Sequence, residues 1–356
     1  MNVLTGYMAK EVLKGSMLAI LFLLTLFNLF TFTDEMKDLG KGSYGLKEIA
    51  LYLALTSPRV FYELVPASAL LGSLFVLGAM ANNRELIAMQ AAGLSVAGII
   101  RAVMAAGAIL VIISIGVGEY VAPSTERKAQ LLKAAAQHDQ ILTHSIYGIW
   151  LRESNKFINV RKIEDNGNLA DISIYALNDQ RRLQSALHAE QASFLGDKQW
   201  QLKQIRQSDI SNEKMQAAAF SEQRLTSSIA PDIVNITVVS PDNLSLLELA
   251  KYVDFLKQNH QKSQVFELAL WSRLINPFVT FVMLMISAPF VIGVRRGISV
   301  GARMIIGVII GLGFNIIDKI VGHVGLIYDL NAPLTALLPS LLTFIAAYWA
   351  LRRSDV

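Results

Sequence analysis

The sequence contains no cysteine, and charged residues make up only 17% of its 356 positions. The absence of cysteine excludes disulfide bonds and thiolate metal sites. Soluble globular proteins usually carry about 25% charged residues, so the chain is poor in charge for its length. The charged residues are unevenly distributed along the chain, because long uncharged apolar stretches lie on both sides of one polar central block. The formal net charge of +4 is mild, and we predict no nucleic acid among the partners.

The residue patterns of common enzymes are also missing. The histidines are scattered and none has metal-ligand spacing with a carboxylate: they are His138, His144, His188, His260 and His323. No G-x-S-x-G motif occurs, and Gly40-Lys41-Gly42-Ser43 is only a fragment of the P-loop pattern. We therefore predict no catalytic, cofactor-binding or metal-binding residues. Any ATP-driven step would require ATP to be bound by a separate partner subunit.

Six stretches qualify, or nearly do, as membrane spans, each of which needs about 20 mainly apolar residues. They cover residues 15–33, 64–83, 102–118, 274–294, 304–317 and 330–351. The first is longer than a signal-peptide core of about 7–15 residues, so we predict a retained helix. The ionisable residues near these spans are expected at helix ends, which leaves no mid-membrane carrier for a coupled ion. They are Glu119, Arg273, Asp318 and Lys319.

The distribution of basic residues in the short loops predicts the orientation. Loops on one side of the spans are rich in lysine and arginine, and the positive-inside rule assigns that side to the cytoplasm. The residues concerned are Lys10, Lys14, Arg84, Arg101, Arg295, Arg296, Arg303, Arg352 and Arg353. Both termini are therefore predicted to be cytoplasmic, with the polar block on the opposite side. The expected domains are 1–123 with three spans, 124–264 outside the membrane, and 265–356 with three further spans.

The central block is predicted to be mainly β-structure. Apolar and polar residues alternate at 158–161, 172–176 and 200–205, and a run rich in β-branched residues follows at 233–239. Short runs separated by turn signals, here Asn166-Gly167 and Gly196-Asp197, are typical of a β-sandwich or a barrel-like domain. The pattern Ser245-x-x-Glu248 is a capping box, which predicts a helix leading back to the membrane.

The loop between the second and third spans contains a helix-prone segment at 82–93 that ends on a glycine. Its candidate contact residues are Arg84, Glu85, Leu86 and Met89. Leu86 and Met89 would share one face, and the two charged residues would lie beside it. A short amphipathic helix of this kind can fit a groove on a partner protein. Two interpretations remain open: a helix that docks onto a partner, and an interfacial loop helix that binds nothing.

A set of motifs runs nearly from end to end of the chain. They are Phe32-x-Asp34-x-x-Lys37 with Gly42-Ser43-Tyr44, Arg84-Glu85-Leu86 with Met89-Gln90-Ala91-x-Gly93, Glu119-x-Val121-Ala122-Pro123, Ser173-Ile174-Tyr175-Ala176 with Arg181-Arg182-Leu183-Gln184-Ser185, and Trp271-Ser272 with Pro277. Each motif alone is weak, but the combination is specific. In these motifs the chain resembles the LptF/LptG family, the permease subunits of the lipopolysaccharide export transporter, and the LptG type more than the LptF type.

The resemblance implies a polytopic α-helical membrane protein with six transmembrane helices and an inserted periplasmic β-jellyroll domain. It also implies a location in the inner membrane of a Gram-negative bacterium. The segment 84–93 would be the coupling helix, with Glu85 at its contact with the ATPase. Lys37 matches a basic position that meets lipopolysaccharide phosphates, and Lys41 is a second candidate for this contact. Asp38 departs from the family pattern, because a second lysine is often found there.

The partners implied by the resemblance are lipopolysaccharide, a paralogous LptF-type permease, a cytoplasmic LptB-type ATPase dimer, an LptC-type bitopic protein and a periplasmic LptA-type bridge. The first and fifth spanning helices would line a lateral opening towards the paralogous subunit. The alternative function is that of a membrane-anchored periplasmic lipid-binding or scaffold protein without transport activity.

Overall fold

The chain divides into two compact units. The computed structural model describes residues 3–137, 148–164, 168–178, 180–210, 214–227, 229, 231, 240–292 and 300–354. We use the name helical unit for Met1–Asp38, Ile49–Ala129 and Gln264–Val356, and the name β unit for Leu39–Glu48 and Gln130–Ser263.

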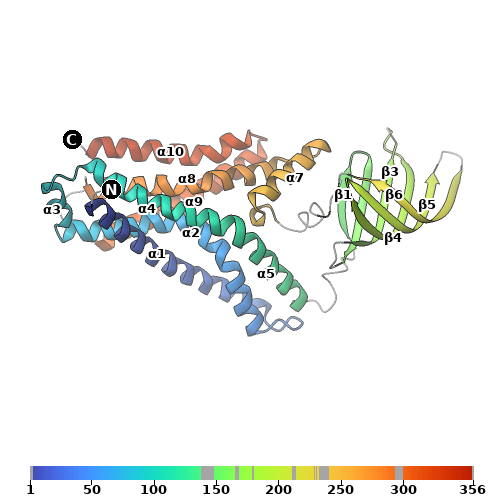
Figure 1. Ribbon diagram of the computed structural model, residues 1–356, viewed down its shortest axis with the longest axis horizontal. Coiled ribbons are helices and arrows are strands. Elements are labelled where there is room, and N and C mark those ends of the chain that lie inside the picture. The colour runs from blue at the N-terminus through green and yellow to red at the C-terminus, as the bar shows by residue number, and fades with distance from the viewer. Residues whose placement is uncertain are drawn as a thin grey trace. The chain divides into compact units, whose positions relative to one another are not determined.

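Six helices within the described residues are long and apolar enough to cross a membrane. Their bounds are α1 Val3–Glu35, α2 Leu46–Asn82, the continuous helix made of α4 Val96–Gly116, η2 Val117–Val121 and α5 Ala122–Gln137, α8 Gln264–Ile292, α9 Val300–Ile327 and α10 Ala332–Ser354. A 3-10 turn, η1 Met36–Asp38, follows α1. The short helix α3, Glu85–Ala91, connects α2 to α4 at the same end of the unit as the N-terminus (Figure 1).

The prediction of six spanning helices is confirmed, but their predicted ends were wrong. At about 1.5 Å per residue, the 37 residues of α2 reach about 55 Å, well beyond a hydrocarbon core of about 30 Å. A search for apolar stretches locates only the part of a helix inside hydrocarbon, because outside it a helix can continue through polar residues. For the same reason, the four ionisable residues expected at helix ends lie within helices that continue past them: Glu119, Arg273, Asp318 and Lys319.

Helix α2 is the most deeply buried of the spanning helices. In its most apolar segment 67% of the residues are buried, compared with 17% for α1 and 6% for α9. Glycines let neighbouring helices approach it closely: Gly15 of α1 lies against Gly72 of α2, and Gly307 of α9 faces leucines of α2. The outward faces of α1 and α9 carry many exposed large apolar side chains, which require cover by lipid or by another protein.

The β unit contains one antiparallel sheet of six strands within the described residues. The strands are β1 Ile149–Glu153, β2 Lys156–Ile163, β3 Leu169–Leu177, β4 Leu183–Gly196, β5 Gln199–Ile210 and β6 Met215–Thr226. They pair in chain order, so each strand connects to its spatial neighbour. The expectation of a β-jellyroll is therefore confirmed only as far as an antiparallel β-sheet. The predicted strand at 233–239 and the predicted turn at Asn166-Gly167 lie outside the described residues.

The alternating sequence pattern places apolar side chains on one face of this sheet. Ile158 of β2 pairs with Ile174 of β3, and Val160 pairs with Ile172; all four side chains are buried. The predicted turn at Gly196 is confirmed, because its φ of 93° lies in the left-handed region that glycine tolerates best. The sheet is followed by a 3-10 turn, η3 Pro241–Asn243, and by helix α7, Leu246–Gln258. The predicted capping box of α7 is present, with Ser245 and Glu248 exchanging hydrogen bonds.

Candidate functional sites

Helix α3 is held on the helical unit by the apolar side chains of Leu86 and Met89. These side chains are only 6% and 8% exposed and belong to one buried cluster with Met8 and Val12 of α1 and Ile99 of α4. A helix this short has little stability of its own in water, so this packing keeps it folded. Leu86 and Met89 share a face, as expected, but that face points into the protein rather than towards solvent.

The two ends of α3 are set by residues with a left-handed backbone. Arg84 precedes the helix with φ 61°, and Gly93 follows it with φ 92°. The N–H of Gly93 donates to the carbonyl of Gln90 at 2.9 Å, and the N–H of Leu94 donates to that of Met89 at 3.0 Å. These bonds satisfy carbonyls at the helix end. The segment therefore turns back into α4 within a few residues.

The outward side of α3 carries Glu85 and Ile87. Asn83 Nδ2 donates to Glu85 Oε1 at 3.3 Å and Tyr7 Oη to Glu85 Oε2 at 3.5 Å; both distances are long for hydrogen bonds. Arg84 is exposed, and Ile87 is 54% exposed. Ile87 was not among the residues predicted from the sequence, although an apolar residue directly beside Leu86 points in a different direction on a helix.

The two candidate lipid-contacting lysines lie in different units. Lys37, in η1 of the helical unit, pairs with Asp34 Oδ1 at 2.8 Å, and both side chains are largely exposed. Lys41 is exposed in the Leu39–Glu48 segment of the β unit.

The motif Gly42-Ser43-Tyr44 has a structural role within the β unit. The N–H of Ser43 donates to the carbonyl of Ala136 at 2.7 Å. A side chain at Gly42 would meet that same carbonyl, and Gly42 has φ 59°. Tyr44 is fully buried. This loop is therefore fastened to the C-terminal part of α5, which explains why these residue types occur together.

A charged junction joins α2, η2 and α8 inside the helical unit. Arg273 Nε of α8 donates to Glu119 Oε1 of η2 at 2.6 Å, and the two side chains are only 9% and 23% exposed. Arg273 Nη2 also donates to the carbonyl of Gly118. The Arg273 guanidinium lies 5.4 Å from the ring centre of Tyr62, whose hydroxyl donates to the Arg273 carbonyl at 3.2 Å. No role for this pair was predicted from the sequence.

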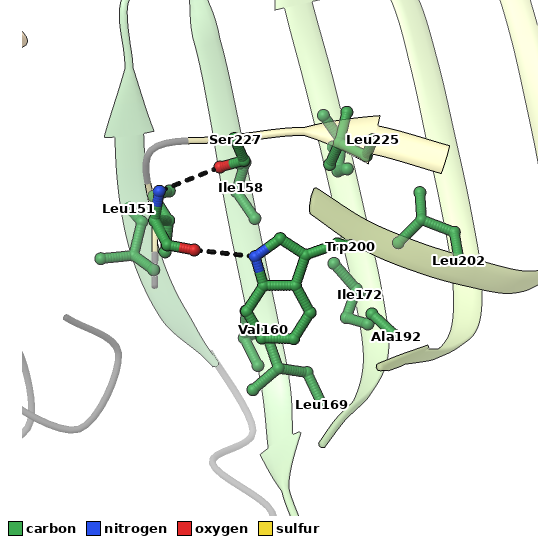
Figure 2. A pocket seen from close by; sticks show the side chains of 12 residues that line it. Leu151, Ile158, Val160, Leu169, Ile172, Ala192, Trp200, Leu202, Leu225 and Ser227 are labelled. Carbon is green, nitrogen blue, oxygen red and sulfur yellow. Dashed lines mark hydrogen bonds between the residues drawn. The ribbon is translucent and has the colours of Figure 1, made fainter. Parts of the chain in front are cut away.

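The buried face of the β-sheet encloses an apolar hollow (Figure 2). Its lining is formed by Leu151, Ile158, Val160, Leu169, Ile172, Ile174, Ala192, Trp200, Leu202, Leu225, Ser227 and Ile229. Trp200 points into this hollow, and its Nε1–H donates to the carbonyl of Ile229 at 2.8 Å. The Ser227 hydroxyl donates to Glu153 Oε2 at 2.8 Å and accepts from the N–H of Ile229 at 3.1 Å. The hollow therefore has apolar walls and a small polar edge.

Replacing Trp200 by alanine is expected to destabilise the β unit by about 3–5 kcal/mol, the usual cost of truncating a buried tryptophan. Hydrogen–deuterium exchange of strands β4 and β5 in the purified full-length chain measures the effect. Trp150→Ala is the matched control, because Trp150 is 55% exposed and stacks on Tyr175. Equal exchange in the two variants would contradict a core role for Trp200.

The fold and these sites define a polytopic membrane protein with one inserted β unit. In the part of the chain that the structure describes, no group of three or more histidine, aspartate or glutamate side chains could hold a metal ion. Six candidate spanning helices, a short helix exposed at one end and an antiparallel β unit form the architecture.

Comparison with known proteins identifies the family within this class. A family model described as "Lipopolysaccharide export system permease LptF/LptG" matches residues 6–353. The chain is 32% identical over 356 residues to the lipopolysaccharide export system permease protein LptG of Escherichia coli (strain K12), covering 99% of each chain. It is 31% identical over 353 residues to the protein of the same name from Haemophilus influenzae, again covering 99% of each. The chain belongs to the LptF/LptG permease family, which confirms the resemblance carried by its motifs.

Proposed function

We propose that the chain is the LptG-type permease subunit of an ABC transporter that extracts lipopolysaccharide from the inner membrane and passes it to a periplasmic bridge towards the outer membrane. The observation that carries this proposal is the end-to-end similarity to LptG permeases. The chain itself is not an enzyme and needs no cofactor. A cytoplasmic LptB-type ATPase dimer binds and hydrolyses the ATP.

The orientation follows from the basic loops. The end of the helical unit that holds α3 and the N-terminus faces the cytoplasm, and both termini lie there. The β unit lies in the periplasm of a Gram-negative cell, and in the sequence its larger part follows the membrane segment 1–123 and precedes the membrane segment 265–356. Its jellyroll topology, expected from the resemblance, stays a prediction. The segment 39–48 is added to the expected block 124–264, because it packs with the β unit.

The exposed apolar faces of α1 and α9 support a lateral contact with the paralogous LptF-type permease. Lipopolysaccharide enters between these helices, where charge-free helix faces accept its acyl chains. Lys37 and Lys41 are exposed and contact its phosphates. The β unit then passes the lipid to an LptC-type bitopic protein and an LptA-type bridge.

Coupling to the ATPase is assigned to α3. Arg84, Glu85 and Ile87 present the docking surface, because these side chains are wholly or partly exposed. Leu86 and Met89 act from the inner side of the helix. They transmit the motion of α3 to α1 and α4, with which they share one buried cluster.

The test is co-purification of the tagged chain with the co-expressed LptF-type and LptB-type subunits, for the wild type, Glu85→Ala and Ile87→Asp. We expect each substitution to weaken ATPase binding by about fivefold to thirtyfold, since central interface residues cost about 1–2 kcal/mol when altered. The stability of the chain stays unchanged, because neither side chain is buried. Lys14→Ala is the control, because the Lys14–Glu11 ion pair lies on α1 at the same end and Lys14 is largely exposed.

The composition of the purified wild-type complex decides the broader assignment. Lipopolysaccharide, a second permease and an ATPase in one complex support the export function. A chain that purifies alone, or only with periplasmic proteins, contradicts it and favours the membrane-anchored scaffold. A normal ATPase complex in both α3 variants would contradict the docking surface alone.

A further inference from the structure

The long helix Val96–Gln137 is irregular at η2, and Pro123 explains the irregularity. A proline has no N–H to donate, and its ring clashes with the carbonyl four residues earlier in a regular α-helix. That carbonyl belongs to Glu119. The chain relieves the clash with a π-helical turn, in which the N–H of Ala122 donates to the carbonyl of Val117, five residues back. Single π turns inside α-helices occur frequently at functional sites.

The π turn leaves the carbonyl of Gly118 without its usual backbone donor. In a regular helix the donor would be the N–H of Ala122, which is used elsewhere. In the π pattern it would be Pro123, which has no N–H. Arg273 of α8 supplies the missing donor through Nη2, while its Nε binds Glu119. One guanidinium thus satisfies both the carbonyl and the carboxylate of successive residues in the turn.

Tyr62 of α2 closes the junction from the other side. A side chain at Gly118 would collide with the Tyr62 ring, so glycine is required for this approach. One turn earlier on α2, Arg59 Nη1 lies 3.4 Å from Glu126 Oε1 of α5, whose side chain is only 4% exposed. The helix is therefore held by charged side chains on both sides of Pro123, by α8 before it and by α2 after it.

The position of the junction sets it apart from a solvated surface pair. Arg273 lies 19 residues from Ile292, or about 29 Å at 1.5 Å per residue. That distance is close to the hydrocarbon thickness of about 30 Å, so the pair lies near the boundary opposite α3. A buried ion pair is often no more stabilising than apolar residues in its place. A contribution to stability therefore does not explain why Arg273 and Glu119 are paired here.

We propose that Arg273 is a positioning residue for transport, which fixes the π turn and with it the direction of α5 relative to α2 and α8. Helix α5 carries the chain out of the helical unit and into the β unit. A fixed π turn keeps α5 moving together with α8 when the bundle rearranges. This proposal rests on the proposed function. It adds that the π turn held by Arg273 couples the motion of the helical bundle to the delivery of the lipid.

The experiment uses the complete complex with its ATPase in lipid nanodiscs, and the absence of native cysteine makes site-specific labelling direct. Spin labels at Lys128→Cys and Val265→Cys, both exposed positions on α5 and α8, report the distance between these helices. We expect a narrow distribution of distances between the two labels in the wild type and a broad distribution in Arg273→Leu. Export of lipopolysaccharide per ATP hydrolysed should fall by about twofold to thirtyfold, the range for residues that modulate coupling between sites.

Two further variants distinguish a positioning role of Arg273 from a role in folding alone. Arg273→Lys keeps the charge and the Glu119 contact but lacks the guanidinium fork, so it should assemble normally and still lose coupling. Pro123→Ala added to Arg273→Leu should narrow the distribution again, because an N–H at position 123 can replace the lost donor. Arg161→Leu, which breaks an exposed ion pair with Asp171, is the control and should leave distribution and coupling unchanged.

The outcomes distinguish this proposal from the proposed function. A wild-type complex that exports no lipopolysaccharide would contradict the proposed function. In another outcome, the wild-type complex exports lipopolysaccharide while Arg273→Lys and Arg273→Leu both keep wild-type distances and wild-type coupling. That result would overturn the positioning role of Arg273 and leave the proposed function standing. Failure of Pro123→Ala to narrow the distribution would overturn the assignment of Arg273 to the Gly118 carbonyl.

Discussion

Replacing Gly72 by leucine is expected to displace α1 from α2 and to destabilise the helical unit by about 3 kcal/mol or more, at or above the upper end for overpacked cores. A Cβ atom at this position would collide with backbone atoms of Gly15 and Ser16 in α1. Backbone atoms cannot rotate away as the end of a side chain can. The strain is therefore relieved only by separating the two helices.

Thermal unfolding of the purified chain in detergent measures this effect. Gly313→Leu is the matched control, because a side chain at Gly313 of α9 would meet nothing within 4 Å. It adds the same volume to an open position and should shift the transition little. The same transition temperature for Gly72→Leu and the control would contradict the close crossing of α1 and α2.

The elements that could be predicted from the sequence are those with a local physical cause. A membrane span needs a continuous apolar stretch, and a half-buried strand needs alternation, so both leave periodic signals. The capping box at Ser245 and the turn at Gly196 depend on residues a few positions apart. The ends of the spanning helices leave no such signal, because a helix loses little when it passes from hydrocarbon into water.

Contacts between distant parts of the chain could not be predicted. Glu119 and Arg273 are 154 positions apart, and each looked like a residue at a helix end. Pro123 was a local sign, because a proline inside a helix leaves one carbonyl without its backbone donor. In the same way, nothing near Gly42 reveals that its loop packs against the end of α5.

Helix α3 shows a third case, in which the element was predicted but not its orientation. Leu86, Ile87 and Met89 are all apolar, and two of them had to point inward. A helix of barely two turns does not reveal which face is buried, because apolar residues surround much of it. The structure resolves this by burying Leu86 and Met89 and exposing Ile87.

Replacing Leu86 by aspartate is accordingly expected to detach α3 from the bundle and to abolish coupling to the ATPase. The carboxylate would have no partner inside an apolar cluster, and such uncompensated burial costs about 3–5 kcal/mol. A seven-residue helix cannot supply that energy from its own hydrogen bonds. The segment therefore unfolds locally while the six long helices remain packed.

Hydrogen–deuterium exchange over residues 82–95 should rise towards the rate of an unstructured peptide, and the ATPase should no longer co-purify. Ile87→Asp introduces the same charge one position away at an exposed site, so it should weaken ATPase binding while its exchange stays close to that of the wild type. The two variants together thus distinguish the role of the buried face of α3 from the role of its exposed face. Protected exchange in Leu86→Asp would show that α3 is not held by this face, and the path from α3 to α1 and α4 would then have to run through Glu85 and Tyr7.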